Sequence, residues 1–222
     1  MFEDLKKLVC EQNRRLPREG LVILTEGNVS QISPDRTCIV IKPSGVSYDM
    51  LAPEDMVVVN LKGMVLEGKH KPSSDTSTHL EIYKKFPAVG GITHTHSLHA
   101  TTFAQMRKPI PCLGTTHADA FWSDIPVTRR LTDKEIEEGY EYHTAQSIGE
   151  VMHSTFTPCV LVADHGPFSF GRDAEESVDR ACILEKIAHM ALLGSQEESL
   201  PGAIARKHFN RKHGEDRYYG QS

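Results

Sequence analysis

The chain has 222 residues, enough for one substantial hydrophobic core but few for two independent domains, and its 39% hydrophobic and 25% charged residues are an ordinary globular balance. The formal net charge of −5 argues against an extended nucleic-acid surface, although a local anion site needs only one lysine and a few amides. The chain has no apolar run near the length of a membrane span, no signal-like amino terminus and no C-x-x-C pair among its five cysteines. We therefore predict a cytoplasmic protein with free thiols, no membrane span and no nucleic-acid partner.

The first part of the chain is predicted to begin with a helix and continue with strands. Residues 2–15 carry apolar side chains at the spacing of one helix face, and residues 25–30 are turn-like. "TCIVIKPSG" (37–45) predicts a buried strand that ends in a Pro-Ser-Gly loop. "DMVVVNLKGMVLEG" (55–68) predicts two strands joined through a glycine.

In the rest of the chain, strands and helices alternate. Residues 71–86 predict a polar loop that leads into a helix with a serine or aspartate N-cap, and 90–102 predicts a strand followed by a short helix. Residues 157–166 predict an apolar strand, and 173–194 is the clearest helix, with acidic residues first and glycine last. The final stretch, 207–222, is basic and aromatic and does not resemble core. This alternation indicates one layered α/β domain with helices on both faces of a sheet.

Three histidines are candidates for a metal site. In "GGITHTHSLHATT", His94 and His96 alternate with threonine, and on a strand such residues face the same side about 7 Å apart. They can therefore converge on one ion, although H-x-H pairs also pack or hydrogen-bond in polar clefts without metal. His165 is expected at the end of a separate apolar strand, where open α/β sheets bind ligands. Three histidines with one open position are typical of catalytic zinc, and Asp75 is a candidate carboxylate ligand.

Three short motifs are candidates for holding an anion. They combine hydroxyls, glycine amides and one lysine, and a helix start beside them would add free N–H groups that attract phosphate. Each motif alone is most often an ordinary turn, but together with a metal site they indicate a phosphorylated small-molecule substrate. The residues are Gly27 and Asn28 in "GN", Lys42, Ser44 and Gly45 in "KPSG", and Ser73 and Ser74 in "PSSD".

The loop "GTTHADAFWSDIP" contains two further polar candidates, His117 and Asp119. Asp119 is either an acid/base group or a solvated loop aspartate, and the sequence favours neither. His99 and His117 are candidates for orienting a ligand of the metal. We expect three other histidines to lie on solvated helix faces or in the tail, namely His79, His189 and His213.

Seven motifs taken together are specific for one protein family. They are "GNVS", "IKPSGV", "EGKHKPSSDTSTH", "GGITHTHSLHATTFAQ", "GTTHAD", "DHGPFSFG" and "KHGEDRYYGQ". In this order they resemble the L-ribulose-5-phosphate 4-epimerases of the class II aldolase and adducin superfamily, from about residue 5 to 221. The resemblance implies a single domain over residues 1–222, a three-layer α/β/α sandwich with a mainly antiparallel central sheet. It also implies a homotetramer with active sites between subunits.

The same resemblance implies a ligand set and a pocket. One zinc ion per subunit would be held by Asp75, His94, His96 and His165, although such ligands also suit other divalent metals. The sugar phosphate would be bound by the seven residues of the three anion motifs, Gly27, Asn28, Lys42, Ser44, Gly45, Ser73 and Ser74.

The chemistry that the resemblance implies is the interconversion of L-ribulose 5-phosphate and D-xylulose 5-phosphate. Zinc polarises the carbonyl, retro-aldol cleavage breaks the C3–C4 bond, and the aldehyde rotates and is attacked again on its other face. Each face needs a proton acceptor and donor, which by resemblance are Asp119 and Tyr219, the latter from a neighbouring subunit. His208 and Arg211 would belong to a segment of about residues 203–222 that docks at the subunit interface and completes the next site.

Two alternatives remain open. A class II sugar-phosphate aldolase of the fuculose-phosphate type is similar at the histidines but carries glutamate where Asp75 stands, and a non-catalytic adducin-like assembly module should have lost metal ligands. Asp75, Asp119 and the YYGQ ending favour the epimerase. The chain departs from the epimerase pattern at Glu26, where tryptophan is common, and in a loop over 143–158 that looks short; we expect both to affect pocket shape and assembly more than chemistry.

Overall fold

In the part of the chain that the structure describes, seven strands form one sheet in the order β4-β3-β2-β1-β5-β7-β6, and each neighbouring pair in it is antiparallel. The computed structural model describes residues 2–154, 157–194, 198–215 and 217–219. The strands are β1 (Asn28–Ile32), β2 (Cys38–Ile41), β3 (Val57–Asn60), β4 (Val65–Glu67), β5 (Gly91–His94), β6 (Cys159–Leu161) and β7 (Pro167–Gly171).

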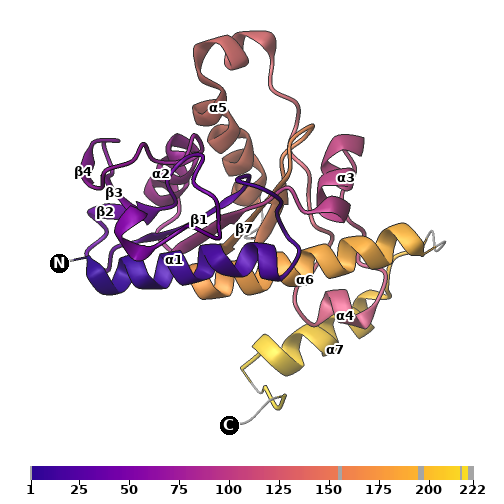
Figure 1. The fold of residues 1–222 in the computed structure, drawn as a ribbon. Helices are drawn as coiled ribbons and strands as arrows, with labels where there is room; N and C mark the ends of the chain where they lie inside the picture. The colour runs from indigo at the N-terminus through magenta and orange to yellow at the C-terminus, as the bar shows by residue number, and fades with distance from the viewer. Residues whose placement is uncertain (1, 155–156, 195–197, 216, 220–222) are drawn as a thin grey trace.

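Helices cover both faces of this sheet, as Figure 1 shows. One face packs against α1 (Glu3–Arg18) and α6 (Ala174–Leu193), and the other against α2 (Thr76–Lys85) and α5 (Asp133–Ser154). The predicted α/β/α sandwich with a mainly antiparallel sheet is therefore confirmed. The other helices in the described residues are η1 (Pro53–Asp55), α3 (Leu98–Met106), α4 (Thr115–Ala118) and α7 (Gly202–His213).

Covered faces on both sides explain why β2 reads as an uninterrupted apolar run. Successive side chains of a strand point to opposite faces. Ile39 and Ile41 accordingly pack in the core under α2 and α5, whereas Cys38 and Val40 pack in the core under α1 and α6. A strand with one face in water would instead alternate apolar and polar residues.

The long helix predicted over 173–194 is confirmed as α6. Asp173 is its N-cap, and the Asp173 carboxylate accepts a hydrogen bond of 2.8 Å from the amide of Glu176. Gly194 follows its last residue. Such a cap satisfies one of the free amides of the first turn, which stabilises a helix by about 1 kcal/mol.

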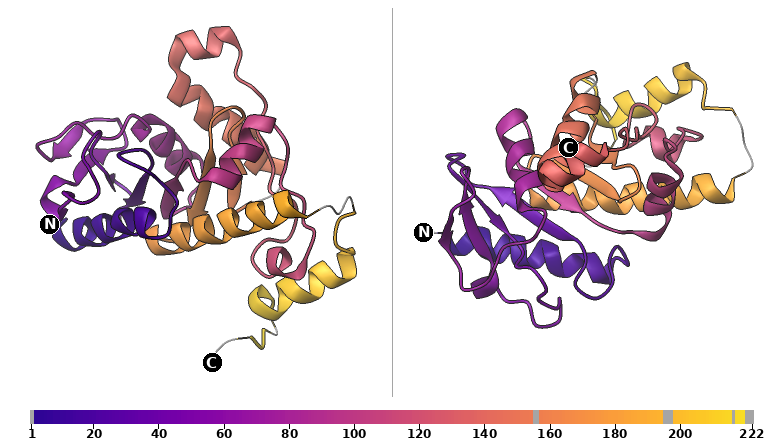
Figure 2. Two further views of the ribbon diagram at one scale, coloured as in Figure 1. Left: turned by 45° about the vertical axis from the view of Figure 1, so that its right-hand side comes forward. Right: turned by 90° about the horizontal axis from the view of Figure 1, so that it is seen from above.

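The carboxyl-terminal part of the chain extends beyond α6. Figures 1 and 2 show α4 and α7 together on the side of α6 that faces away from the sheet, and α7 packs directly against α4. Three residues of the predicted tail motif, Asp216, Gly220 and Gln221, lie outside the described residues. None of the helices in the described ranges combines the length and apolar character needed to cross a bilayer.

The structure corrects three of the expected elements. The stretch 25–30 was expected as a turn, but β1 begins at Asn28. The apolar strand expected over 157–166 is shorter, because β6 ends at Leu161 and His165 lies in the turn before β7. The segment over 143–158 is not a short loop, because most of it belongs to α5; residues 155–156 lie outside the described ranges.

Candidate active site

The candidate site lies at one end of four adjacent strands. Antiparallel pairing places Asn28, the first residue of β1, opposite His94, the last residue of β5, and His94 in turn opposite Phe168 of β7. Lys42 directly follows the last residue of β2, at the same end of these strands. A cavity of about 310 Å³ opens there. Eleven of the residues predicted to bind metal or substrate line it, namely Gly27, Asn28, Lys42, Ser44, Gly45, Ser73, Ser74, Asp75, His94, His96 and His165.

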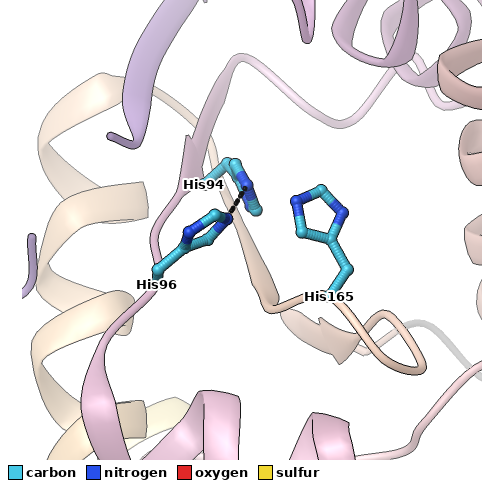
Figure 3. A group of neighbouring side chains, drawn as sticks. All are labelled: His94, His96 and His165. Atoms are coloured by element: carbon cyan, nitrogen blue, oxygen red, sulfur yellow. Dashed lines mark hydrogen bonds between the residues drawn. The ribbon is translucent and has the colours of Figure 1, made fainter. Parts of the chain in front are cut away.

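Three imidazole rings converge in this cavity. One nitrogen from each of His94, His96 and His165 lies within 4.8 Å of the others, and the Nε2 atoms of His94 and His96 are 3.2 Å apart (Figure 3). Two nitrogen ligands at about 2.0–2.1 Å from one tetrahedral zinc ion would lie about 3.4 Å apart. The three rings therefore fit a divalent metal of this size. Only His94 belongs to β5, and His96 reaches the same point from the loop that follows the strand.

In two of the rings, Nδ1, which we call the outer nitrogen, has an uncharged partner. Nδ1 of His94 donates to the carbonyl oxygen of Pro167 at 3.0 Å, and Nδ1 of His165 lies 3.1 Å from the hydroxyl of Tyr140. A partner on Nδ1 fixes the orientation of a ring and leaves Nε2 for a metal. Burial lowers the pKa of His94 and of His165, because it disfavours the imidazolium form, so both rings are neutral as metal coordination requires.

Asp75 lies beside the histidines. Among the described residues, however, its carboxylate does not belong to the group of ligand atoms that lie within 4.8 Å of one another. It occupies the predicted N-cap position of α2, yet its side chain does not cap the helix. The Asp75 carboxylate instead accepts a 2.6 Å hydrogen bond from the Asn28 amide. Burial by itself raises the pKa of Asp75, but electrostatic interaction with the neighbouring His94 and His79 rings and the Asn28 hydrogen bond outweigh this and lower it. Asp75 is therefore held as a carboxylate inside the cavity.

Lys42 is buried in the wall of the cavity, with 1% of its surface exposed. Nζ donates to the carbonyl oxygens of Thr25 and Pro43, both at 3.3 Å, and lies 4.7 Å from the centre of the Tyr48 ring. Within the described ranges, no carboxylate lies within ion-pair distance of this ammonium, and burial lowers the pKa of Lys42 to about 8. A buried cation with only neutral partners is suited to an anionic ligand.

The serines and glycines of the anion motifs lie on two loops that run side by side. The amide of Ser73 donates to the carbonyl of Lys42, and the amide of Ser44 donates to the carbonyl of Lys71, each at 3.0 Å. These bonds bring the "KPSG" and "PSSD" loops together around the Lys42 side chain. Asn28 joins them, because its amide also donates to the Ser73 hydroxyl at 3.1 Å, while its own side-chain carbonyl oxygen is buried without a partner among the described residues.

Gly27 brings a third loop against the end of β5. Its φ is +73°, and a Cβ there would lie 2.6 Å from Cγ1 of Val22 and 2.9 Å from the carbonyl oxygen of His94. Gly27→Ala should therefore destabilise the protein by about 1–3 kcal/mol and lower its metal affinity, since the backbone of His94 must move. Urea unfolding and zinc titration would measure the two effects.

Gly63→Ala is the matched control for this prediction. Gly63 also has a positive φ, of +86°, but lies in the turn between β3 and β4, where, apart from Gly63 itself and its two chain neighbours, no atom of the described residues comes within 4 Å of the place that a methyl group would take. The stability loss of Gly63→Ala should therefore report only the free-energy cost of placing a side chain at a positive φ, and its metal affinity should be unchanged. Equal losses of stability in the two variants would show that close packing at Gly27 contributes nothing.

Asp119 and the predicted tail residues meet outside this cavity. The Asp119 carboxylate accepts hydrogen bonds from Nε and Nη2 of Arg211 at 2.9 and 2.5 Å and from Nδ1 of His208 at 3.0 Å. The Tyr219 ring lies over the Arg211 guanidinium, 5.0 Å away. Partial burial raises the pKa of Asp119, but the bonds from Arg211 and His208 outweigh it and lower that pKa. Within its own chain, Asp119 therefore anchors α7 and lies apart from the three histidines.

The other histidines lie elsewhere. The prediction that His79 lies on a solvated face is wrong, because it is completely buried and its Nδ1 is 2.7 Å from the Ser30 hydroxyl. Burial lowers the pKa of His79 to about 3. His189 is exposed on α6, as expected.

The two histidines predicted to orient a metal ligand make their contacts away from the three converging rings. Nδ1 of His99 lies 2.6 Å from the Glu185 carboxylate, and Nε2 of His117 lies 3.0 Å from a backbone carbonyl in its own loop. Two residues whose side chains contact the rings at Nδ1, Tyr140 and Glu26, were not predicted in this role. Tyr140 lies on α5, for which the sequence offered no separate signal.

Comparison with known proteins agrees with this architecture. The class II aldolase and adducin N-terminal domain matches residues 7–192. The fold is similar to an L-fuculose 1-phosphate aldolase at a TM-score of 0.80 and 23% identity, over 94% of this chain and 95% of that one. It is similar to the L-fuculose 1-phosphate aldolase from Glaciozyma antarctica PI12 (TM-score 0.77, 20% identity, 94% and 81% of the two chains).

A third similar structure is the l-fuculose-1-phosphate aldolase from Thermus thermophilus, with a TM-score of 0.66 and 24% identity over 85% of this chain and 92% of that one. At these identities the similarity establishes the fold and leaves the substrate open. The match to the domain spans most of the sequence, including the cavity and all three converging histidines. This chain belongs to the class II aldolase and adducin family.

Proposed function

We propose that this protein is a zinc-dependent 4-epimerase that interconverts L-ribulose 5-phosphate and D-xylulose 5-phosphate. The observation that carries the proposal is one cavity lined both by three converging imidazoles and by a buried lysine that, in the described part of the chain, has no carboxylate partner. A ketose phosphate offers the matching groups, since its carbonyl and adjacent hydroxyl suit a metal and its phosphate suits the lysine.

Different residues of the cavity would bind the metal, the phosphate and the sugar hydroxyls. Zinc, held by His94, His96, His165 and Asp75, would supply a Lewis acid for cleavage and re-formation of the C3–C4 bond. Lys42 would neutralise the phosphate, assisted by the hydroxyls and amides of the two serine loops. The buried carbonyl oxygen of the Asn28 side chain would accept a hydrogen bond from a sugar hydroxyl. Holding both ends of the substrate keeps the cleaved aldehyde in place until it rotates and is attacked again.

Proton transfer on the two faces of the aldehyde is assigned to Asp119 and Tyr219. Because both lie in the α4–α7 region and outside the cavity of their own chain, we propose that they act at the cavity of a neighbouring subunit in a homotetramer. The segment of about residues 203–222, including His208 and Arg211, would then complete that neighbouring site. Asp119 is a carboxylate in this arrangement, because its contacts lower its pKa, and this form suits a proton acceptor.

A Tyr219→Phe protein should bind zinc and assemble normally but epimerise about 10²–10⁴-fold more slowly, the usual contribution of one proton-transfer group. Single-turnover and steady-state rates, metal content and light scattering measure these properties. Tyr218→Phe removes the neighbouring exposed hydroxyl and should leave the rate unchanged.

Mixed oligomers test whether the groups come from different chains. Subunits carrying Tyr219→Phe, reassembled with subunits carrying His94→Asn, should recover part of the activity, because some sites would combine an intact metal centre with an intact tyrosine. No recovery in verified mixed oligomers, or full turnover by Tyr219→Phe alone, would contradict the assigned role.

The proposed reaction itself is tested by a proton NMR time course of the zinc-loaded protein with L-ribulose 5-phosphate. Appearance of D-xylulose 5-phosphate without free aldehyde is the expected result. The second candidate is a sugar-phosphate aldolase, which the similarity to L-fuculose 1-phosphate aldolases favours. Accumulating dihydroxyacetone and glycolaldehyde phosphate, or cleavage of L-fuculose 1-phosphate in a parallel sample, would support that candidate instead. A protein inert toward both substrates would favour an adducin-like assembly role.

A further inference from the structure

Glu26 is, among the described residues, the one carboxylate that contacts the three converging imidazoles through an outer nitrogen. Its Oε2 atom lies 3.4 Å from Nδ1 of His96, and its side chain lines the cavity. The corresponding nitrogens of His94 and His165 have neutral partners, a backbone carbonyl and a tyrosine hydroxyl. His96 thus differs from the other two rings in facing a negative charge.

The Glu26 side chain is held in this position by its own loop. Its Oε1 atom accepts a 3.0 Å hydrogen bond from the amide of Ile23, so the two carboxylate oxygens have separate partners. The hydroxyl of Tyr48 donates to the backbone carbonyl of Glu26 at 2.7 Å. Gly27, which follows, allows the loop to lie directly against the end of β5. The carboxylate is therefore built into the wall of the cavity.

We propose that Glu26 is a positioning residue that orients His96 for the metal by accepting a hydrogen bond from Nδ1. This inference rests on the proposed metal site. A proton kept on Nδ1 leaves the Nε2 lone pair for the ion, and a carboxylate partner also increases the basicity of the imidazole. Direct ligation of the metal by Glu26 would require the carboxylate to leave His96, which is why the geometry favours the outer role.

The test compares zinc affinity of the full-length protein with that of Glu26→Ala, Glu26→Gln and the control Glu19→Gln, in competition with a chelator of known affinity. Glu19 is an exposed carboxylate just after α1, so its variant makes the same change of charge away from the cavity. Loss of an outer partner typically costs 10–100-fold in metal affinity, and we expect a loss of about that size for Glu26→Ala. Glu26→Gln should fall between it and the wild type, since an amide oxygen still accepts from Nδ1. Glu19→Gln should match the wild type.

A second measurement separates orientation from folding. Long-range ¹H–¹⁵N NMR spectra of the zinc-loaded proteins should show His96 with its proton on Nδ1 in the wild type and Glu26→Gln, and a weakened or exchanging signal in Glu26→Ala. Thermal unfolding of the metal-free proteins checks that the loop change leaves the fold intact.

Three different results would each overturn a different part of the proposal. Wild-type zinc affinity and an unchanged His96 signal in Glu26→Ala would refute the positioning role. A loss in Glu26→Gln as large as in His96→Gln would make Glu26 a direct ligand instead. Failure of the wild-type protein itself to bind zinc would reject the metal site and with it the proposed function.

Discussion

A His94→Asn protein should lose more than about 100-fold in zinc affinity and be almost inactive in the NMR assay. Loss of a residue that only hydrogen-bonds to a metal ligand typically lowers metal affinity about 10–100-fold, and loss of the ligand itself should lower it further. His94 is the ring at which the sheet and the cavity meet: it ends β5, donates to Pro167 and stacks on Phe168 with ring centres 4.2 Å apart. Zinc should correspondingly raise the unfolding temperature of the wild type but not of the variant, since a ligand stabilises only the state that binds it.

His189→Asn is the matched control, because His189 is exposed on α6 and outside the cavity. It should keep both zinc affinity and turnover. Some loss of stability is expected in metal-free His94→Asn, about 1–3 kcal/mol, because a buried ring is removed. Full activity of a metal-poor His94→Asn protein would contradict a metal-dependent mechanism.

A Lys42→Met protein should bind sugar phosphate about 10–100-fold more weakly and yet be more stable than the wild type near pH 7. The first effect follows from the loss of a charge-assisted hydrogen bond to phosphate, worth about 1.5–3 kcal/mol. The second follows from burial, which lowers the pKa of Lys42 from 10.5 to about 8. Keeping this ammonium charged at pH 7 then costs roughly 3 kcal/mol of folding free energy, which methionine does not require.

The pH dependence of this stability effect has a definite sign. The unfolded lysine holds its proton up to about pH 10.5, whereas the folded one releases it near pH 8. The cost is therefore fully present below pH 8 and diminishes as the pH rises toward 10.5. The stability gain of Lys42→Met should shrink between about pH 8 and about pH 10.5 in urea unfolding experiments. Phosphate binding by the wild type should weaken over the same interval, because the free protein loses the charge that the ligand needs.

Lys62→Met removes an exposed lysine from the turn between β3 and β4 and should alter neither property. Equal phosphate affinity in Lys42→Met and the wild type would exclude Lys42 from the anion site. A marked loss of stability in Lys42→Met would mean that its bonds to the carbonyls of Thr25 and Pro43 outweigh the cost of burying the charge.

Local patterns were enough to predict most of the layered fold and the lining of the cavity. The apolar runs of β2 and β3 and the capped helix α6 reflect burial and hydrogen bonding that depend mainly on neighbours in the sequence. The H-x-H motif and the short loops around Lys42 are likewise local, because a spacing of two residues or a short turn already places the groups together. Distant His165 was predicted through its position after an apolar strand, although that strand ends earlier than expected.

Contacts between distant segments were decided only by the tertiary structure. Whether Glu26 reaches His96 depends on a loop conformation and on Gly27 packing against β5, and neither has a periodic signal. The same holds for the burial of His79 and for the contact of Tyr140 with His165. Asp119 could be predicted as a functional candidate, but its position beside Arg211 follows from how α7 packs on α4.

Sequence by itself determined which chemical groups are available and which faces are buried, since those follow from residue type and spacing. The tertiary structure decided which groups meet, because side-chain direction and the approach of distant segments depend on the packing of the whole chain.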